Sequence, residues 1–223
     1  MSVTICVLAK YPSVFKGFFD TATRFEENTP KVLVRDGNEI PSPSGWTVIQ
    51  GPEKFSMAGN GNLALKAAPL DSDVLYCGDD VRFLEPDTTK LLQEQAYQDD
   101  HIGILTPRII GRGSNAQVNP RYNLETVQPI EMWFPCVYIK REVFNRIGYL
   151  DDSFNEFGSD DLDYCLRTVK SGLRLAVTTQ VAVRHEHAPN GGPTTFTMKL
   201  GAAEWQRQQR LAYEKLQKKH GLS

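Results

Sequence analysis

The chain has 223 residues, a formal net charge of -2 and an isoelectric point near 6.1, so its overall charge gives no indication of nucleic-acid binding or of acidic partners. A chain of this length buries roughly 70% of its unfolded surface on folding, which is ample for a hydrophobic core. It shows neither the apolar N-terminal run of a signal peptide nor about 20 consecutive apolar residues, so we expect a cytoplasmic protein without a transmembrane segment.

Four cysteines lie singly in apolar contexts and lack the spacing of a zinc site. They are Cys6, Cys77, Cys136 and Cys165. We predict reduced core residues, in keeping with a cytoplasmic location.

Strands and helices are predicted to alternate along the chain. Apolar runs with the composition of strands occupy residues 3–9, 31–34 and 73–77. Helical composition occurs at residues 13–28, 62–68, 88–100 and 140–147, with Pro86 and Asp87 as a start signal for the third of these. This alternation predicts an α/β sandwich.

Polar residues follow each of the three predicted strands. Lys10 and Tyr11 follow the first, Asp36 follows the second, and Asp79 and Asp80 follow the third. Ligands bind at the carboxyl ends of strands in open α/β sheets. Mg²⁺ and Mn²⁺ are often held there by one or two carboxylates plus substrate phosphates, although an isolated Asp-Asp pair is more often part of a turn.

A glycine-rich segment precedes the third strand. Gly59, Asn60, Gly61 and Asn62 have the composition of a turn that opens into a helix. Such a turn lets backbone N–H groups approach a ligand, and the start of a helix favours anions. An ordinary structural turn is the alternative interpretation.

The second half of the chain contains an acidic pair at a predicted helix start. Ser159 is a good N-cap, Asp160 and Asp161 follow it in the first turn, and Gly172 ends the helix. Two short strands at residues 173–177 and 181–183 should follow, which places His185 where a strand ends. The alternative is a capped amphipathic helix followed by a surface histidine.

The order of these motifs resembles family 2 glycosyltransferases of the GT-A fold, of the rhamnosyltransferase or galactosyltransferase kind. The matching positions are residues 148–152, Phe157, Asp160, Asp161, Asp163, Leu166, Arg167, residues 172–175 and His185. The chain departs from the family where Asp160 replaces Glu and where Gly78 occupies the first position of the Asp-x-Asp motif. Gly158, before the acidic pair, also fits the galactosyltransferase pattern.

The resemblance implies a GT-A type α/β/α sandwich with a mainly parallel sheet, as a single domain plus a C-terminal helix. Residues 1–193 would form the catalytic domain, with a donor half at 1–100 and an acceptor half at 101–193, and residues 194–223 a helical tail. The implied activity is inverting, metal-dependent transfer of a hexose from a nucleotide-diphosphate sugar, with UDP the expected nucleotide, to an acceptor hydroxyl.

The resemblance also implies roles for single residues. Asp161 would be the general base, a role that suits a carboxylate whose pKa is raised by a neighbouring one, and Asp160 would orient the acceptor or the base. Asp80 and His185 would hold Mn²⁺ or Mg²⁺, and a histidine ligand slightly favours Mn²⁺. His187 is the competing ligand.

The remaining predicted contacts concern the two substrates. The nucleotide sugar would contact Ala9, Tyr11, Asp36, Gly59, Asn62 and Asp79. Trp133 would stack on the acceptor sugar, although a core or hinge role is as plausible. The acceptor itself, a glycan, a lipid-linked molecule or a nucleic acid, is left open. Two other functions also stay open: a nucleotidyltransferase that makes nucleotide sugars, and a noncatalytic sugar-nucleotide or carbohydrate-binding protein.

Three segments stand apart from these motifs. Residues 107–130, rich in Gly, Asn and Pro, predict a mobile loop on the acceptor side, and the glycines at 191–192 suggest a lid. Residues 201–220 predict a helix with an apolar stripe of Trp205, Leu211 and Leu216 and a solvated basic face. This helix would pack on the domain or on a second subunit of a homo-oligomer, with guidance of an anionic acceptor as a lesser possibility.

Overall fold

A computed structural model describes residues 2–36, 39–52, 56–154, 158–186 and 201–222. Within these residues a single nine-stranded sheet has the order β3-β2-β1-β4-β8-β6-β9-β5, and β7 pairs with β9. The strands are β1 (Ser2–Ala9), β2 (Lys31–Arg35), β3 (Thr47–Gln50), β4 (Ser72–Gly78), β5 (Val81–Phe83), β6 (Ile102–Gly111), β7 (Glu125–Thr126), β8 (Cys136–Ile139) and β9 (Arg174–His185).

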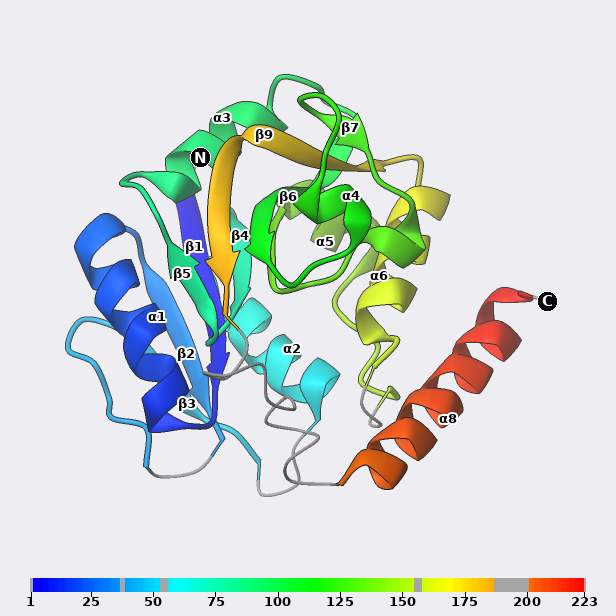
Figure 1. The fold of residues 1–223 in the computed structure, drawn as a ribbon, viewed down its shortest axis with the longest axis horizontal. Helices are drawn as coiled ribbons and strands as arrows, with labels where there is room; N and C mark the ends of the chain where they lie inside the picture. The colour runs from blue at the N-terminus through cyan, green and yellow to red at the C-terminus, as the bar shows by residue number, and fades with distance from the viewer. Residues whose placement is uncertain (1, 37–38, 53–55, 155–157, 187–200, 223) are drawn as a thin grey trace.

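Strand direction divides the sheet into two parts. The strands β3, β2, β1 and β4 are parallel neighbours, so their carboxyl ends meet at one edge, the lower edge in Figure 1. The strand β8 runs antiparallel to both β4 and β6, and β6 is again parallel to β9. The short strand β5 returns antiparallel to the end of β9 and brings the segment after β4 next to it.

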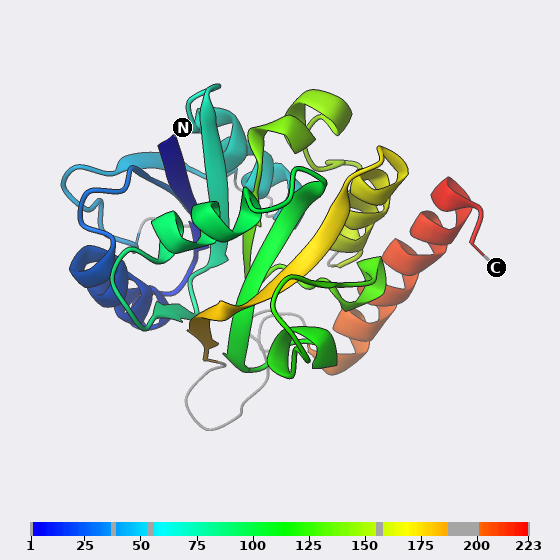
Figure 2. The same ribbon diagram turned by 90° about the horizontal axis from the view of Figure 1, so that it is seen from above.

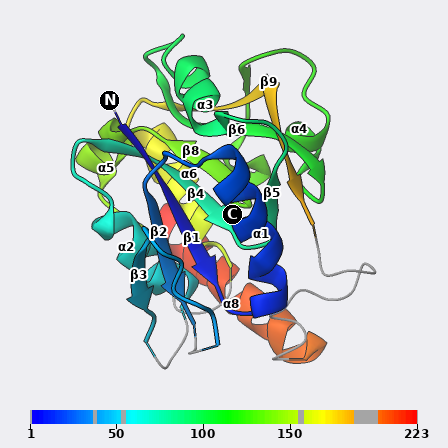
Figure 3. The ribbon, with the colours of Figure 1, turned by 90° about the vertical axis from the view of Figure 1, so that its left-hand side faces the viewer.

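Helices cover both faces of the sheet. They are α1 (Pro12–Phe25), α2 (Met57–Ala67), α3 (Thr88–Ala96), α4 (Asn115–Val118), α5 (Arg141–Ile147), α6 (Asp160–Lys170) and α8 (Ala202–His220), with a 3-10 helix η1 (Pro129–Glu131). Phe15 and Phe18 of α1 and Leu92 of α3 pack in one core, whereas Leu65 of α2 and Tyr164 of α6 pack in the other. Figure 3 shows α1 and α2 on opposite sides of β1 and β2. The predicted α/β sandwich is confirmed.

The helix α8 lies outside the sandwich, beside α6 (Figure 2). Ala212 and Leu216 are buried against Phe154, so the apolar stripe includes Leu216 as predicted but uses Ala212 where Leu211 was expected. The helices in the described part of the chain include none that is both long and apolar enough to cross a membrane.

A buried ion cluster fastens the last turns of α8 to α6. The carboxylate of Asp163, with 0% exposure, lies 2.6 Å from Lys219 Nζ, 2.8 Å from His220 Nε2 and 2.8 Å from Arg167 Nε. Burial alone would raise the pKa of Asp163, but the hydrogen bonds from Lys219, His220 and Arg167 lower it overall. Asp163 and Arg167, four residues apart on α6, form an ion pair. The predicted basic face is not fully solvated at this end of α8, since Lys219 and His220 contact Asp163.

Several predicted elements differ from those observed. The glycine-rich segment is not a turn but the first half of α2, because Ser56 caps the helix by accepting from Gly59 N at 3.1 Å. The two predicted strands after α6 are one strand, β9, with a register shift where it passes Pro107 of β6. Residues 107–130 are not a structureless loop, since they include the end of β6, α4 and β7. Most other predicted helices and strands are confirmed within a few residues of their ends.

The predicted N-cap at Ser159 is correct in position but not in chemistry. Ser159 has φ 65°, in the left-handed region, and its side chain makes no capping hydrogen bond. All four cysteines are buried and free, as predicted.

Replacing Asp163 by Ala should lower the free energy of unfolding by about 3 kcal/mol, because Arg167, Lys219 and His220 lose the buried carboxylate that they share. Glu214→Ala removes an exposed partner of Arg210 on α8 and should leave stability nearly unchanged. Urea unfolding of the two variants tests this, and equal effects would contradict an anchoring role for the cluster.

Candidate active site

The carboxyl ends of β1, β2 and β4 are joined by short polar contacts. Asp36 N donates to Ala9 O at 2.8 Å, and the Lys10 ammonium forms an ion pair with the Asp36 carboxylate. Lys10 N also donates to Asp79 Oδ2 at 3.3 Å. The structure thus brings together Ala9, Asp36 and Asp79, three of the residues predicted to contact the nucleotide. Lys10 was not predicted as a site residue, although a lysine directly after the first strand was the available signal.

Negative charge is poorly balanced at the end of β4. Burial raises the pKa of Asp79 to about 7, and the charge of neighbouring Asp80 contributes in the same direction. Arg82 donates to the carbonyl oxygen of Asp79 at 3.0 Å. An added cation would therefore be bound favourably beside these two carboxylates.

Asp80 and His185 meet because of strand register. In the antiparallel pairing of β5 with β9, Val81 lies opposite His185, so the preceding Asp80 comes alongside the histidine. His185 Nε2 lies 3.1 Å from Asp80 Oδ2, and both side chains are partly buried. Burial by itself would lower the pKa of His185, but the hydrogen bond and charge of Asp80 raise it overall.

The donor atoms of this pair fit a divalent cation. His185 Nδ1 contacts the carbonyl oxygen of Arg112, a hydrogen bond that requires Nδ1 to carry the proton. In the neutral ring the Nε2 lone pair then faces the Asp80 carboxylate, and the contact is favourable only with a proton or a metal ion between the two atoms. Two adjacent ligands of an octahedral ion, each about 2.1 Å from it, lie about 3.0 Å apart, close to the observed separation.

No group of three or more His, Cys, Asp or Glu side chains within the described ranges is arranged to hold a metal. Substrate oxygens would have to complete the coordination, as is usual for Mg²⁺ bound with phosphates. His187, the competing ligand, lies outside the described residues, as do Phe157 and the glycines of the suggested lid.

Asp160 and Asp161 are the first two residues of α6, and burial raises the pKa of both. Asp160 is 8% exposed, and burial together with the charge of Asp161 raises its pKa to about 7. Burial also raises the pKa of Asp161, whose Oδ1 accepts from Leu162 N at 2.8 Å. Both carboxyl groups therefore lose their protons less readily than exposed aspartates do. The charges of Asp160 and Asp161 act on Tyr76 of β4, so the first turn of α6 lies near the carboxyl end of that strand.

Two buried polar atoms near the carboxyl edge of the sheet lack a hydrogen-bond partner among the described residues. Tyr76 Oη, on β4, is one, and burial with the charges of Asp160 and Asp161 raises the pKa of this tyrosine. Asn60 Oδ1, in the first half of α2, is the other. Orphaned polar atoms are rare in protein interiors and often mark functional positions. The only signal for Tyr76 in the sequence was a tyrosine within an apolar strand.

Gly59 and Asn62 are already engaged by the protein. Gly59 N donates to the Ser56 cap, and Asn62 bridges to Leu150 by donating to its carbonyl oxygen at 2.9 Å and accepting from its N–H at 3.0 Å. Their predicted contacts with the nucleotide stay predictions, and these internal bonds count against them.

Tyr11 and Trp133 were predicted to contact the two substrates. Tyr11 is half-buried and its carbonyl accepts the first hydrogen bonds of α1. Trp133 is 40% exposed, and its backbone is held by the Gln117 amide, which donates to Trp133 O at 2.9 Å. The Trp133 ring is thus available at the surface, as an acceptor contact would require, and its role stays a prediction.

Comparison with known proteins identifies the fold. No protein-family model matches the chain, and no curated protein matches its sequence. The crystal structure of S. aureus TarS residues 1–349 matches with a TM-score of 0.64 and 15% identity, over 82% of this chain and 60% of that one. A structure of GalNAc-T7 with UDP, GalNAc and Mn²⁺ matches with a TM-score of 0.69 and 13% identity, over 92% of this chain and 46% of that one.

These matches establish the GT-A type fold of this chain. A second S. aureus TarS structure agrees, with a TM-score of 0.61 and 14% identity over 85% of this chain and 37% of its own length. The chain therefore spans less than two thirds of each of these proteins. At such low identities the likeness concerns the fold alone, and substrates and chemistry have to be argued from this chain's residues.

The raised pKa of Asp160 gives a prediction for stability. An aspartate in the unfolded chain has a pKa near 3.9, so between about pH 4 and 7 the folded state binds more protons, and this residue's contribution to stability is lost as pH rises through about 7. Asp160→Asn, which cannot ionise, should gain about 2 to 4 kcal/mol relative to wild type between pH 5 and pH 8. Urea titrations at both pH values measure this, and parallel changes in the two proteins would contradict it.

Proposed function

We propose that this chain is an inverting, metal-dependent glycosyltransferase that moves a sugar from a nucleotide-diphosphate sugar, a UDP-sugar, to an acceptor hydroxyl. The observation that carries the proposal is the pairing of Asp80 with His185 at the carboxyl edge of a GT-A type sheet, with the buried acidic pair of α6 near the carboxyl end of β4. The GalNAc-T7 structure, described with UDP, GalNAc and Mn²⁺, supports the choice of donor and metal.

The donor would lie along the ends of β1, β2 and β4. Asp36, held by Lys10, would accept hydrogen bonds from the base, while Ala9, Tyr11 and Asp79 would line the nucleoside. The Asn60 amide oxygen, which lacks an internal partner, adds an acceptor at the start of α2. In this arrangement residues 1–100 form the donor half and residues 101–193 the acceptor half.

Asp161 acts as the general base. In this proposal Asp161 is the charged member of the pair, the role that the family resemblance gives to its second acid, while burial and the charge of Asp161 raise the pKa of Asp160 to about 7. Its carboxylate takes the proton of the acceptor hydroxyl while that oxygen bonds to the anomeric carbon from the side opposite the diphosphate. The bond from the anomeric carbon to the diphosphate oxygen breaks, and its electron pair leaves with the nucleoside diphosphate. Asp80 and His185 would hold a Mn²⁺ or Mg²⁺ ion, which would supply positive charge for this leaving group.

The base assignment is tested by a donor screen. Purified protein with Mn²⁺ and a panel of UDP-, GDP- and dTDP-sugars should release free nucleoside diphosphate from one donor. Asp161→Asn should reduce the rate at least about 100-fold, because proton transfer by a positioned base contributes at least that much. Asp100→Asn, an exposed aspartate ahead of β6, is the matched control and should keep the wild-type rate.

Other results of this screen separate the alternatives. Pyrophosphate release from a nucleoside triphosphate would indicate a nucleotidyltransferase. Donor binding in a thermal-shift assay without turnover would indicate a noncatalytic binding protein, and absence of both binding and turnover would overturn the nucleotide-sugar interpretation.

The metal site is tested by calorimetry, independently of activity. Mn²⁺ binding in the presence of UDP should weaken at least about tenfold in His185→Ala and in Asp80→Asn, because each variant removes one of the two protein ligands. His101→Ala alters an exposed histidine in the turn before β6 and serves as the control. Unchanged Mn²⁺ affinity in both ligand variants would contradict the assignment.

A further inference from the structure

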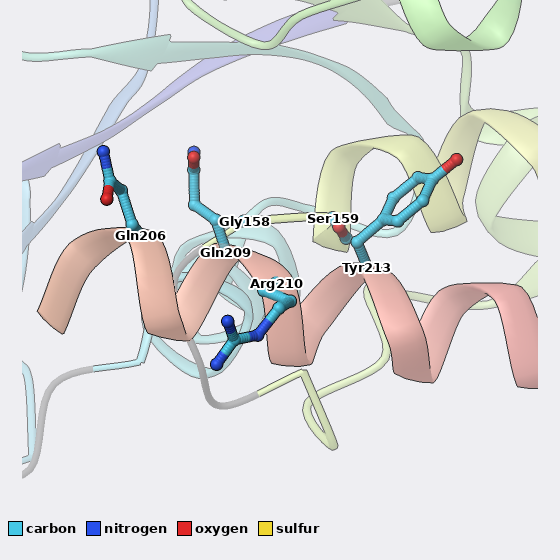
Figure 4. Close-up of a pocket in the computed structure, with 6 residues that line it drawn as sticks. All are labelled: Gly158, Ser159, Gln206, Gln209, Arg210 and Tyr213. Atoms are coloured by element: carbon cyan, nitrogen blue, oxygen red, sulfur yellow. The ribbon is translucent and has the colours of Figure 1, made fainter. Parts of the chain in front are cut away.

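A polar pocket opens beside the acidic pair, between α8 and the segment that leads into α6. Its volume is about 430 Å³, and it is lined by Gly158, Ser159, Gln206, Gln209, Arg210 and Tyr213 (Figure 4). Ser159 directly precedes Asp160 in the chain. The pocket wall at Ser159 is therefore one residue along the chain from Asp160 and two residues from Asp161, the proposed general base.

Two residues of the pocket floor have left-handed backbone conformations. Gly158 has φ 102° and Ser159 has φ 65°, and both values lie in the region that disfavours side chains. A Cβ on Gly158 would reach ordinary contact with the Gln209 side chain at 3.9 Å. The Ser159 hydroxyl is not used to cap α6, and this leaves it for a ligand at the pocket wall.

The wall formed by α8 carries hydrogen-bonding groups and an aromatic ring. Positions 206, 209, 210 and 213 have the spacing of neighbours on a helix surface. Figure 4 shows Gln206, Gln209 and Tyr213 projecting from one side of α8, with Arg210 on the adjoining side. Tyr213 is 43% exposed. The Gln206 and Gln209 amides and the Tyr213 hydroxyl can both donate and accept hydrogen bonds, as the hydroxyls of a sugar require. The exposed Tyr213 ring can pack on the apolar face of a sugar.

The charges of α8 favour a neutral ligand over an anionic one. Lys219 and His220 are held by Asp163, and Lys215 contacts the carbonyl oxygen of Ser153. Among the described residues that line the pocket, Arg210 is the cation, and Glu214 lies 3.8 Å from it. Arg207 is likewise paired with Glu204, so much of the positive charge of α8 is either balanced within the helix or used to dock it on the domain.

We propose that this pocket is the acceptor subsite and that the acceptor is a neutral carbohydrate whose reacting hydroxyl is presented to Asp161. The proposal rests on the proposed function for the identity of the reaction, and it adds the acceptor class and its binding residues. A volume of this size lies within the range of small-ligand pockets, about 300 to 1,000 Å³, and suits one or two sugar units. The C-terminal helix is then part of the substrate site and not only a packing element.

Saturation-transfer NMR on the full chain with UDP and Mg²⁺ tests the subsite. The probes are the methyl glycosides of glucose, galactose and N-acetylglucosamine, maltose, and glucose 6-phosphate, each at millimolar concentration. At least one neutral saccharide should bind, and Tyr213→Ala and Gln209→Ala should each weaken it about tenfold, equivalent to about 1.4 kcal/mol. Lys218→Ala, at an exposed position of α8 outside the pocket lining, should bind like wild type.

The outcomes separate this proposal from the proposed function. No neutral saccharide binding in wild type, or equal binding in the pocket variants, overturns the subsite. Preference for glucose 6-phosphate that Arg210→Gln abolishes overturns the neutral class. Failure of the proposed function appears separately, as the absence of UDP-sugar hydrolysis by the wild-type protein in the donor screen.

Discussion

Negative charge at the carboxyl edge of the sheet is the constraint around which this structure is arranged. Asp36, Asp79 and Asp80 stand at strand ends, and Asp160 and Asp161 open α6 near the carboxyl end of β4. The fold supplies Lys10 to Asp36 and His185 to Asp80, but Asp79 and Asp160 keep pKa values raised to about 7. Folding alone does not require so many buried or half-buried carboxylates, since removing each charge from water costs free energy. A bound cation and polar substrates would offset that cost.

The contrast with Asp163 shows that burial alone does not explain the raised values. Asp163 lies in the same first turn of α6 and is also buried, yet its pKa is lowered because Arg167, Lys219 and His220 donate hydrogen bonds to it. One face of the turn is therefore neutralised and used to hold α8, while the other is left without a basic partner among the described residues. Within this one turn, Asp163 therefore anchors α8, whereas Asp160 and Asp161 have the raised pKa values that are common at functional sites.

The sequence predicted the fold because the strand and helix patterns were strong and the order of motifs was distinctive. Apolar runs such as residues 73–77 became buried strands almost without change. The error at α2 arose because two glycines and two asparagines disfavour a helix locally, whereas the Ser56 cap and close packing outweigh that preference. A Cβ at Gly61 would lie 2.8 Å from Leu150 and 2.9 Å from Tyr76 Oη, so the glycine permits close packing and not a turn.

The candidate site was only partly predictable. The Asp80–His185 contact depends on the register of β5 against β9, and the sequence contained no sign that β5 is a strand. The α8 pocket depends on the docking of a distant helix through Asp163, and a helical pattern predicts the helix but not its position. Contacts between segments far apart in the chain are set by tertiary packing, which a single sequence does not encode in any local pattern.

Gly78 is the residue where the chain departs most clearly from the Asp-x-Asp pattern, and the structure suggests a reason. A Cβ at this position would lie 2.7 Å from Asp80 Oδ1. The absent side chain therefore leaves room for the Asp80 carboxylate to fold back over β4, the rotamer in which its other oxygen meets His185. The glycine at position 78 and the Asp80–His185 contact therefore depend on each other. The site lacks an acidic side chain at position 78 but contains a close Asp–His pair. Substrate oxygens would complete the coordination of the metal.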